Sequence, residues 1–157
     1  MLDIGTKAPA FSLPDQNGAQ RSLEDFQGKW LLVYFYPKDA TPGCTTEAQE
    51  LRDQYEQFTA YNAEIVGVST DSVESHKKFA EKQNLPFTLL ADTEKEMVAA
   101  YGVYGPKQFM GKSYEGVSRS SYLISPDGNI AKVYEKVKPK EHPAEVLGDL
   151  AELTESA

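Results

Sequence analysis

The segment from Trp30 to Arg52, with the sequence WLLVYFYPKDATPGCTTEAQELR, constrains the fold more than any other part of the chain. It begins with a continuous apolar and aromatic run that ends at Pro37, a pattern typical of a strand buried on both faces. Beyond a short loop, apolar residues recur at helical spacing between charged ones, which predicts an amphipathic helix that ends near Asn62. A buried strand that leads through a loop into a helix is typical of α/β proteins.

Cys44 is the only cysteine, and it stands where the predicted strand gives way to the helix. Free N–H groups and the positive end of the helix dipole favour an anion in a first helical turn. For a thiol that anion is the thiolate, which is the nucleophilic form. A lone cysteine is more often an inert buried side chain. Its position beside the loop residues Thr41, Pro42 and Gly43 nevertheless favours a catalytic role for Cys44.

The remaining sequence predicts further strands and helices in alternation. A turn signal at residues 17–18 indicates an N-terminal β-hairpin, and residues 120–137 indicate a second hairpin. Buried strands are expected at residues 65–70 and 87–90, each followed by a helix, and the chain ends in a further helix. Residues 105–111, which contain two glycines and a proline, are expected to form a loop. This order predicts a mixed central sheet with helices on both faces.

Pro37, Thr41 and Cys44 together spell P-x-x-x-T-x-x-C, and the surrounding YFYPKDATPGCTTE closely resembles the peroxiredoxins. Within that family the chain is most similar to the Q-type branch, also called bacterioferritin comigratory proteins. The resemblance extends through GTKAPAFSLPDQNG near the start and VYGPKQFMGKSYEGVSRSSYLISPDG later on. It implies a single thioredoxin-like domain over residues 1–157. It also implies a thiol peroxidase that reduces hydrogen peroxide and alkyl hydroperoxides through a sulfenic acid on Cys44.

The resemblance also implies roles for the neighbours of Cys44. The Thr41 hydroxyl would donate to the thiolate and accept from a peroxide O–H. Pro37 would shield the sulfur. Arg119, in GVSRSSYLI, would be the active-site arginine, which favours the thiolate and stabilises charge on the departing oxygen. Glu47 would orient that arginine through a bidentate pair, with Gly43 in a supporting place in the loop.

Each of these residues also has an ordinary structural explanation. Thr41 fits a turn or helix cap, and Pro37 fits the end of a strand. A single arginine at a strand edge is usually a solvated charge, and an acid such as Glu47 suits the first turns of a helix. A thioredoxin-fold interaction module without catalysis is therefore the alternative function. The joint presence of the four expected catalytic residues favours the enzyme.

The net charge of the chain limits the classes of molecule that it is expected to bind. A formal net charge of −8 argues against nucleic acid and anionic membranes as partners. Neither a secretory signal nor a membrane-spanning run is visible, and one cysteine cannot form an internal disulfide, so a cytoplasmic location is expected. His76 and His142 are interpreted as surface residues, and no pattern indicates a metal or another cofactor.

The family places a second, resolving cysteine at one of two positions, and this chain has Gln49 and Ala80 there. The chain therefore resembles a member with one cysteine. Its sulfenic acid would need an external thiol, with thioredoxin, glutaredoxin and glutathione as the candidate reductants. We expect a monomer or a weak dimer.

Overall fold

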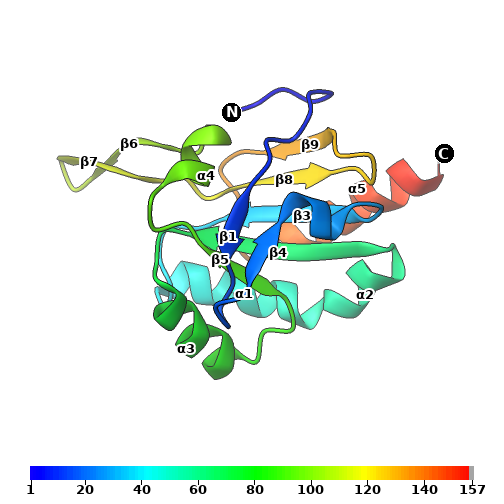
Figure 1. The fold of residues 1–157 in the computed structure, drawn as a ribbon. Helices are drawn as coiled ribbons and strands as arrows, with labels where there is room; N and C mark the ends of the chain where they lie inside the picture. Colours follow the sequence, from blue (N-terminus) through cyan, green and yellow to red (C-terminus); the bar gives the residue numbers. More distant parts are fainter. Residues whose placement is uncertain (156–157) are drawn as a thin grey trace.

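Five strands form the central sheet of the computed structural model, which describes residues 1–155 (Figure 1). They are β3 (Trp30–Phe35), β4 (Ala63–Ser69), β5 (Thr88–Ala91), β8 (Ser120–Ile124) and β9 (Ile130–Tyr134). Their order across the sheet is β5-β4-β3-β8-β9. β3, β4 and β5 are parallel, whereas β8 is antiparallel to both β3 and β9. The sheet is mixed, as predicted.

β3 lies at the centre of the sheet and is buried on both faces. Leu31, Val33 and Phe35 face one hydrophobic core, and Leu32 and Tyr34 face the other. None of these five side chains is more than 1% exposed. Successive side chains of a strand point to opposite faces, so burial on both faces requires an uninterrupted apolar run. The apolar run that begins at Trp30 is therefore the middle of the fold.

Helices cover both faces of the sheet, as predicted (Figure 1). One face carries α1 (Pro42–Asp53), α2 (Tyr55–Ala60), α3 (Val73–Gln83) and α5 (His142–Glu155). The other face is covered by α4 (Glu96–Ala100), the 3₁₀ helix η1 (Leu23–Phe26) and residues of the N-terminal segment. The expected N-terminal hairpin is present as β1 (Ser12–Pro14) and β2 (Gln20–Ser22). These features confirm a thioredoxin-like fold of mixed sheet and two helical layers.

The expectation of a loop at residues 105–111 is wrong. The structure has a hairpin there, formed by β6 (Tyr104–Phe109) and β7 (Lys112–Val117), which projects from the body of the molecule (Figure 1). Its two turn residues, Met110 and Gly111, have φ values of 51° and 78°. Two-residue hairpin turns need this left-handed backbone, which Asn-Gly and Asp-Gly usually supply. Methionine at the first turn position concealed the turn signal.

Two further expectations are corrected. The helix after Cys44 does not continue to Asn62, because α1 ends at Asp53 and the chain leaves the helical path at Gln54, with ψ at 5°. The two histidines are not surface residues: His76 is 0% exposed and His142 is 1% exposed. Both have polar partners in the interior, which allow a polar side chain to be buried at low cost.

No helix within residues 1–155 combines the length and the apolar character that crossing a membrane requires.

Candidate active site

The site lies where the carboxyl end of β3 passes through residues 37–41 into α1. Thr41 is the N-cap residue of α1, and Cys44 follows in the first helical turn. The Cys44 side chain is only 1% exposed. Because α1 is twelve residues long, its free N–H groups and dipole add a substantial positive potential at this end. The sulfur is thus held in a nearly closed place that favours a negative charge.

Arg119 reaches this sulfur from the short link between β7 and β8. Its Nη2 lies 3.4 Å from Cys44 Sγ, and the Arg119 side chain is 21% exposed. Burial works against the charge of Arg119, but the neighbouring Cys44 and Glu47 outweigh it and raise the pKa of Arg119 above its ordinary value. The guanidinium is therefore a fixed positive charge beside the thiol, in the place that the resemblance to the peroxiredoxins implies.

Glu47 lies one turn after Cys44 and is 0% exposed. Its Oε1 accepts a hydrogen bond from Arg119 Nη1 over 2.8 Å, whereas Oε2 has no hydrogen-bond partner. The predicted bidentate pair is therefore wrong in this detail, because Nη2 is directed at the sulfur instead. Burial raises the pKa of Glu47 to about 7, although the charge and hydrogen bond of Arg119 act to lower it. The two residues form an ion pair across the helix–sheet boundary.

Gly43 lies in the first turn of α1 and not in the loop, where it was expected together with Pro42, because the helix already begins at Pro42. At this position Gly43 allows the guanidinium to approach the backbone of α1. A Cβ atom at this position would lie 2.9 Å from Arg119 Nη2, which is closer than real Cβ contacts. Any larger residue would therefore displace the atom that contacts the sulfur. The supporting place that the resemblance gives to Gly43 thus has a steric reason.

Thr41 and Pro37 both lie in the loop, and both residues are half-buried. The Thr41 hydroxyl donates to the carbonyl of Lys38 over 2.9 Å. Its single proton is thus engaged in the loop, and its oxygen lone pairs remain to accept a hydrogen bond. In this arrangement Thr41 offers the predicted acceptor to a peroxide O–H but not the predicted donor to the thiolate.

Sequence reasoning missed Lys107, on β6. Its Nζ donates to the carbonyl of Val117 over 2.9 Å, two residues before Arg119. Burial and the charge of Arg119 lower the pKa of Lys107, while Cys44 acts to raise it. Lys107 is therefore a second cation in the field of the site. The β6–β7 hairpin, which stands in place of the expected loop, brings Lys107 close to the site. No pattern in the sequence indicated that Lys107 would lie there.

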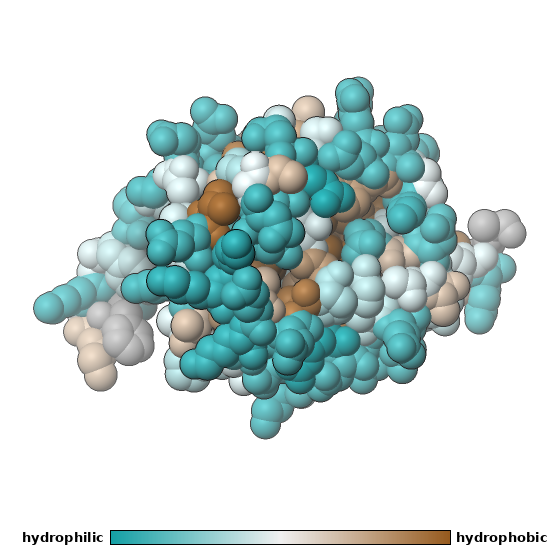
Figure 2. Space-filling view, turned by 60° about the horizontal axis from the view of Figure 1, so that its bottom comes forward, coloured by the Kyte–Doolittle hydropathy of each residue, from teal (hydrophilic) through white to brown (hydrophobic). Residues whose placement is uncertain are grey.

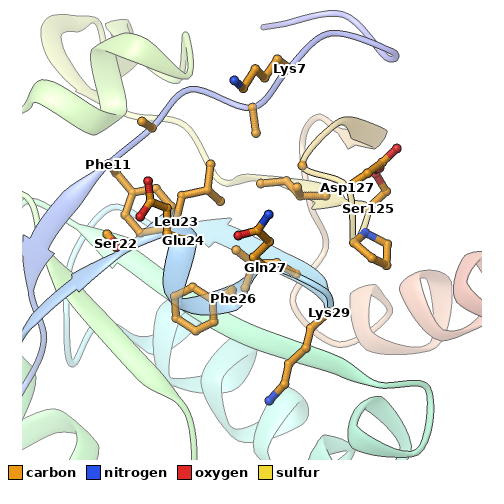
Figure 3. A pocket seen from close by; sticks show the side chains of 16 residues that line it. Lys7, Phe11, Ser22, Leu23, Glu24, Phe26, Gln27, Lys29, Ser125 and Asp127 are labelled. Carbon is orange, nitrogen blue, oxygen red and sulfur yellow. The ribbon is translucent and has the colours of Figure 1, made fainter.

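A further cavity lies away from this site. It has a volume of about 500 Å³, and its lining residues come from the segments 7–11, 22–31 and 124–128. Figure 3 shows Phe11, Leu23 and Phe26 on its apolar side, with the charged ends of Lys7 and Lys29 at its margins. Leu31, at the start of β3, lines this cavity, whereas Cys44 follows the other end of that strand. The cavity is therefore separate from the site around the thiol.

Comparison with known proteins shows the family of the chain. A family model described as the AhpC/TSA family matches residues 4–133. The chain is 47% identical to peroxiredoxin Bcp of Bacillus subtilis over 154 residues, which are 98% of each protein. It is 48% identical to peroxiredoxin Bcp of Escherichia coli over 151 residues, 96% of this chain and 97% of that protein.

Solved structures of bacterioferritin comigratory proteins and PrxQ proteins are also similar to this chain. Xanthomonas campestris bacterioferritin comigratory protein, studied for its alkyl peroxide reduction activity, superposes with a TM-score of 0.88 at 38% identity, over 95% of this chain and 98% of that one. A cysteine-to-serine mutant of Xylella fastidiosa PrxQ superposes with a TM-score of 0.92 at 34% identity, over 98% of each chain. The chain therefore belongs to the AhpC/TSA family and, within it, to the Bcp or Q-type peroxiredoxins, which are thiol peroxidases, with Cys44 as its single cysteine.

Proposed function

We propose that this peroxiredoxin reduces hydrogen peroxide and alkyl hydroperoxides at Cys44, as one catalytic domain that spans the chain. The observation that carries the proposal is the approach of Arg119 Nη2 to within 3.4 Å of Cys44 Sγ at the start of α1. The alkyl peroxide reduction activity named for the Xanthomonas campestris relative supports the choice of substrates. A module without catalysis would have no use for a half-buried cation held against a buried thiol.

The reaction begins when the Cys44 thiolate attacks the hydroxyl oxygen of the peroxide. The S–O bond forms as the O–O bond breaks, so sulfur is oxidised to a sulfenic acid. The departing alkoxide or hydroxide takes a proton and leaves as alcohol or water. Arg119 stabilises the negative charge that moves from sulfur to the departing oxygen. Thr41 accepts a hydrogen bond from the peroxide hydroxyl, and Pro37 limits the access of water to the sulfur.

Recycling then uses thiols from outside the chain. One thiol condenses with the sulfenic acid to a mixed disulfide and releases water, and a second thiol releases Cys44. Thioredoxin, glutaredoxin and glutathione are the proposed reductants, because Gln49 and Ala80 occupy the positions where relatives carry a resolving cysteine.

We further propose that the protein acts in the cytoplasm as a monomer or a weak dimer. Figure 2 shows the face of the molecule that lies at the bottom of Figure 1, turned toward the viewer. This face is largely hydrophilic and has small hydrophobic areas. Among the described residues, only four large apolar side chains are exposed: Met1, Ile4, Met110 and Tyr114. Such a surface offers little area for a permanent interface.

The test is intact mass spectrometry after one equivalent of hydrogen peroxide, with dimedone present to trap a sulfenic acid. We expect one dimedone adduct on Cys44, and none in Cys44→Ser, because a hydroxyl is a far weaker nucleophile at neutral pH. Turnover assays with thioredoxin, glutaredoxin and glutathione then identify the reductant. An unchanged mass after peroxide would favour the alternative, a module without catalysis.

A further inference from the structure

Asp39 is a buried carboxylate in the loop between β3 and α1, two residues before Thr41, and it is 6% exposed. Tyr36 donates to its Oδ1 over 2.6 Å, and the Ser75 hydroxyl donates to its Oδ2 over 2.8 Å. His76 Nδ1 lies 2.7 Å from the same Oδ2. None of these contacts belongs to the thiol site described above. They connect the loop before Cys44 to α3.

His76 itself is 0% exposed and has acceptors at both ring nitrogens. Its Nε2 lies 2.8 Å from the carbonyl oxygen of Leu90, on β5, and a carbonyl can only accept. Nε2 therefore carries a proton. At Nδ1 the partner is a carboxylate that Tyr36 and Ser75 already donate to, and a donor at Nδ1 completes the hydrogen bonds of that carboxylate.

The charge of Asp39 agrees with this assignment. Burial acts to raise the pKa of Asp39, but the hydrogen bond and charge of His76, together with the hydrogen bonds from Tyr36 and Ser75, hold it below its ordinary value. The lowered pKa favours the ionised carboxylate of Asp39, and His76 is its nearest donor. The two side chains form a buried ion pair whose remaining hydrogen-bonding positions are also satisfied.

Asp71 holds the backbone of the same loop residue. Its Oδ2 accepts from the main-chain N–H of Asp39 over 2.9 Å and from the Ser69 hydroxyl over 2.6 Å. Candidate ligand atoms of Asp39, Asp71 and His76 lie within 4.8 Å of one another, a spacing that a metal ion would also need. The hydrogen bonds already given occupy these atoms, so the cluster is a closed hydrogen-bond network.

The loop needs such support, because its backbone is strained next to Asp39. Ala40 has a φ of 64°, in the left-handed region that costs free energy for any residue other than glycine. Thr41 follows directly and is the N-cap residue of α1, so a shift of Asp39 would move both the Thr41 hydroxyl and the first turn that carries Cys44. The network connects this strained turn to three parallel strands of the sheet.

We propose that the buried Asp39–His76 ion pair positions the loop that carries Thr41 and leads into Cys44, and that His76 is thereby a positioning residue for peroxide reduction. The proposal rests on the proposed function of Cys44. His76 does not contact the sulfur or the substrate. It acts through Asp39, from a helix that sequence reasoning did not connect with the site.

The first experiment measures the second-order rate of Cys44 oxidation by hydrogen peroxide in stopped flow. We expect His76→Gln to be slower by roughly 10- to 100-fold, because small displacements of reacting groups have effects of this size. Ser72→Ala is the matched control: it removes the N-cap hydrogen bond of the same helix, from Ser75 N to Ser72 Oγ, without touching Asp39. This control should keep the parent rate, which separates positioning from a general weakening of α3.

Alkylation by iodoacetamide is the second readout, since it needs the thiolate but not a positioned peroxide. We expect His76→Gln to keep the parent rate of alkylation. An equal loss of both rates would overturn the proposal, because the pair would then act on the thiolate itself. The proposal would also be overturned if folded His76→Gln reacted with peroxide at the same rate as the parent protein. A parent protein that does not react with peroxide would instead contradict the proposed function.

Nitrogen NMR of the uniformly labelled parent tests the ion pair without any variant. We expect both ring nitrogens of His76 to carry protons at neutral pH, and a ring with one proton would contradict the proposal. Asp39→Asn supplies a second variant if His76→Gln does not fold. Asp39→Asn should lose peroxide reactivity while alkylation is retained, and an unchanged peroxide rate would count against the pair.

Discussion

Arg119 Nη2 lies 3.4 Å from Cys44 Sγ, although 75 positions separate the two residues in the chain. The strand order explains the contact, because β8 pairs directly with β3 and Arg119 immediately precedes β8. The antiparallel pairing brings Ser120, at the start of β8, opposite Phe35, at the end of β3. Arg119, just before β8, therefore lies next to the N-terminus of α1, which follows β3 in the chain.

The first prediction concerns the shape of this cation. Arg119→Lys keeps the positive charge but loses the fork that contacts Glu47 and Cys44 at once. We expect peroxide oxidation of Cys44 to slow by about 10²–10³-fold, the effect of removing one preorganised donor. Stopped-flow oxidation measures it. Arg21→Lys, at an ion pair with Asp15 and Asp25 away from the site, is the control and should keep the parent rate.

The second prediction concerns the space at Gly43. In Gly43→Ala the new Cβ would lie 2.9 Å from Arg119 Nη2, so the guanidinium must move away from the sulfur. We expect a slower reaction with peroxide and little change in the free energy of unfolding, because alanine suits a helix better than glycine. Gly148→Ala, in α5, is the control, since its Cβ would meet nothing within 4 Å. Equal peroxide rates in both variants would contradict the steric role of Gly43.

The third prediction concerns the pH dependence of stability. Burial raises the pKa of Glu47 from 4.5 to about 7, so the folded protein binds more protons than the unfolded chain between these values. The stability contributed by protonated Glu47 is fully present below the lower value and is lost as the pH rises toward the upper one. Relative to Glu47→Gln, the parent should lose about 3 kcal/mol of unfolding free energy across this window.

Urea unfolding of the reduced parent and of Glu47→Gln, at a series of pH values, checks this difference. If the parent instead gains stability relative to the variant as the pH rises, the attraction of Arg119 outweighs the burial of Glu47. The same variant should react more slowly with peroxide, because Nη1 of Arg119 loses its carboxylate partner.

Much of the fold and the centre of the site follow from local pattern. The apolar run from Trp30 to Tyr36 predicted a buried strand, and the amphipathic pattern beyond it predicted a helix that starts close to Cys44, so the setting of Cys44 was predictable. The place of Arg119 followed from a resemblance rather than from spacing. Its contact with Cys44 depends on which strands pair, and a sequence pattern does not specify that.

The buried polar residues were not predictable for a different reason. His76 sits among charged residues in the sequence, and hydropathy cannot distinguish a solvated histidine from one with a buried partner. That partner, Asp39, is 37 positions away. Lys107 was missed because the turn at Met110 lacks the usual residues, so its hairpin was expected to be a loop.

The last prediction concerns recycling, and it follows from the lone cysteine. Without a second thiol, the Cys44 sulfenic acid should persist after peroxide, and a second peroxide should oxidise it to sulfinic acid, which most systems do not reverse. Gln49→Cys would supply a thiol five positions later in α1. An intact helix holds these two Cα atoms beyond the roughly 7 Å limit for a disulfide, so the first turns of α1 must unwind before the bond can form.

Gln49 now links α1 to α3, because its Nε2 donates to Gln83 Oε1 over 2.8 Å. Gln49→Ser is therefore the matched control, since it removes this hydrogen bond without adding a thiol. After excess peroxide without reductant, we expect an internal disulfide in Gln49→Cys and a sulfinic acid in both the control and the parent. Intact mass and thiol titration distinguish these products. If the parent resists excess peroxide as well as Gln49→Cys does, recycling does not depend on an external thiol, and the one-cysteine mechanism is wrong.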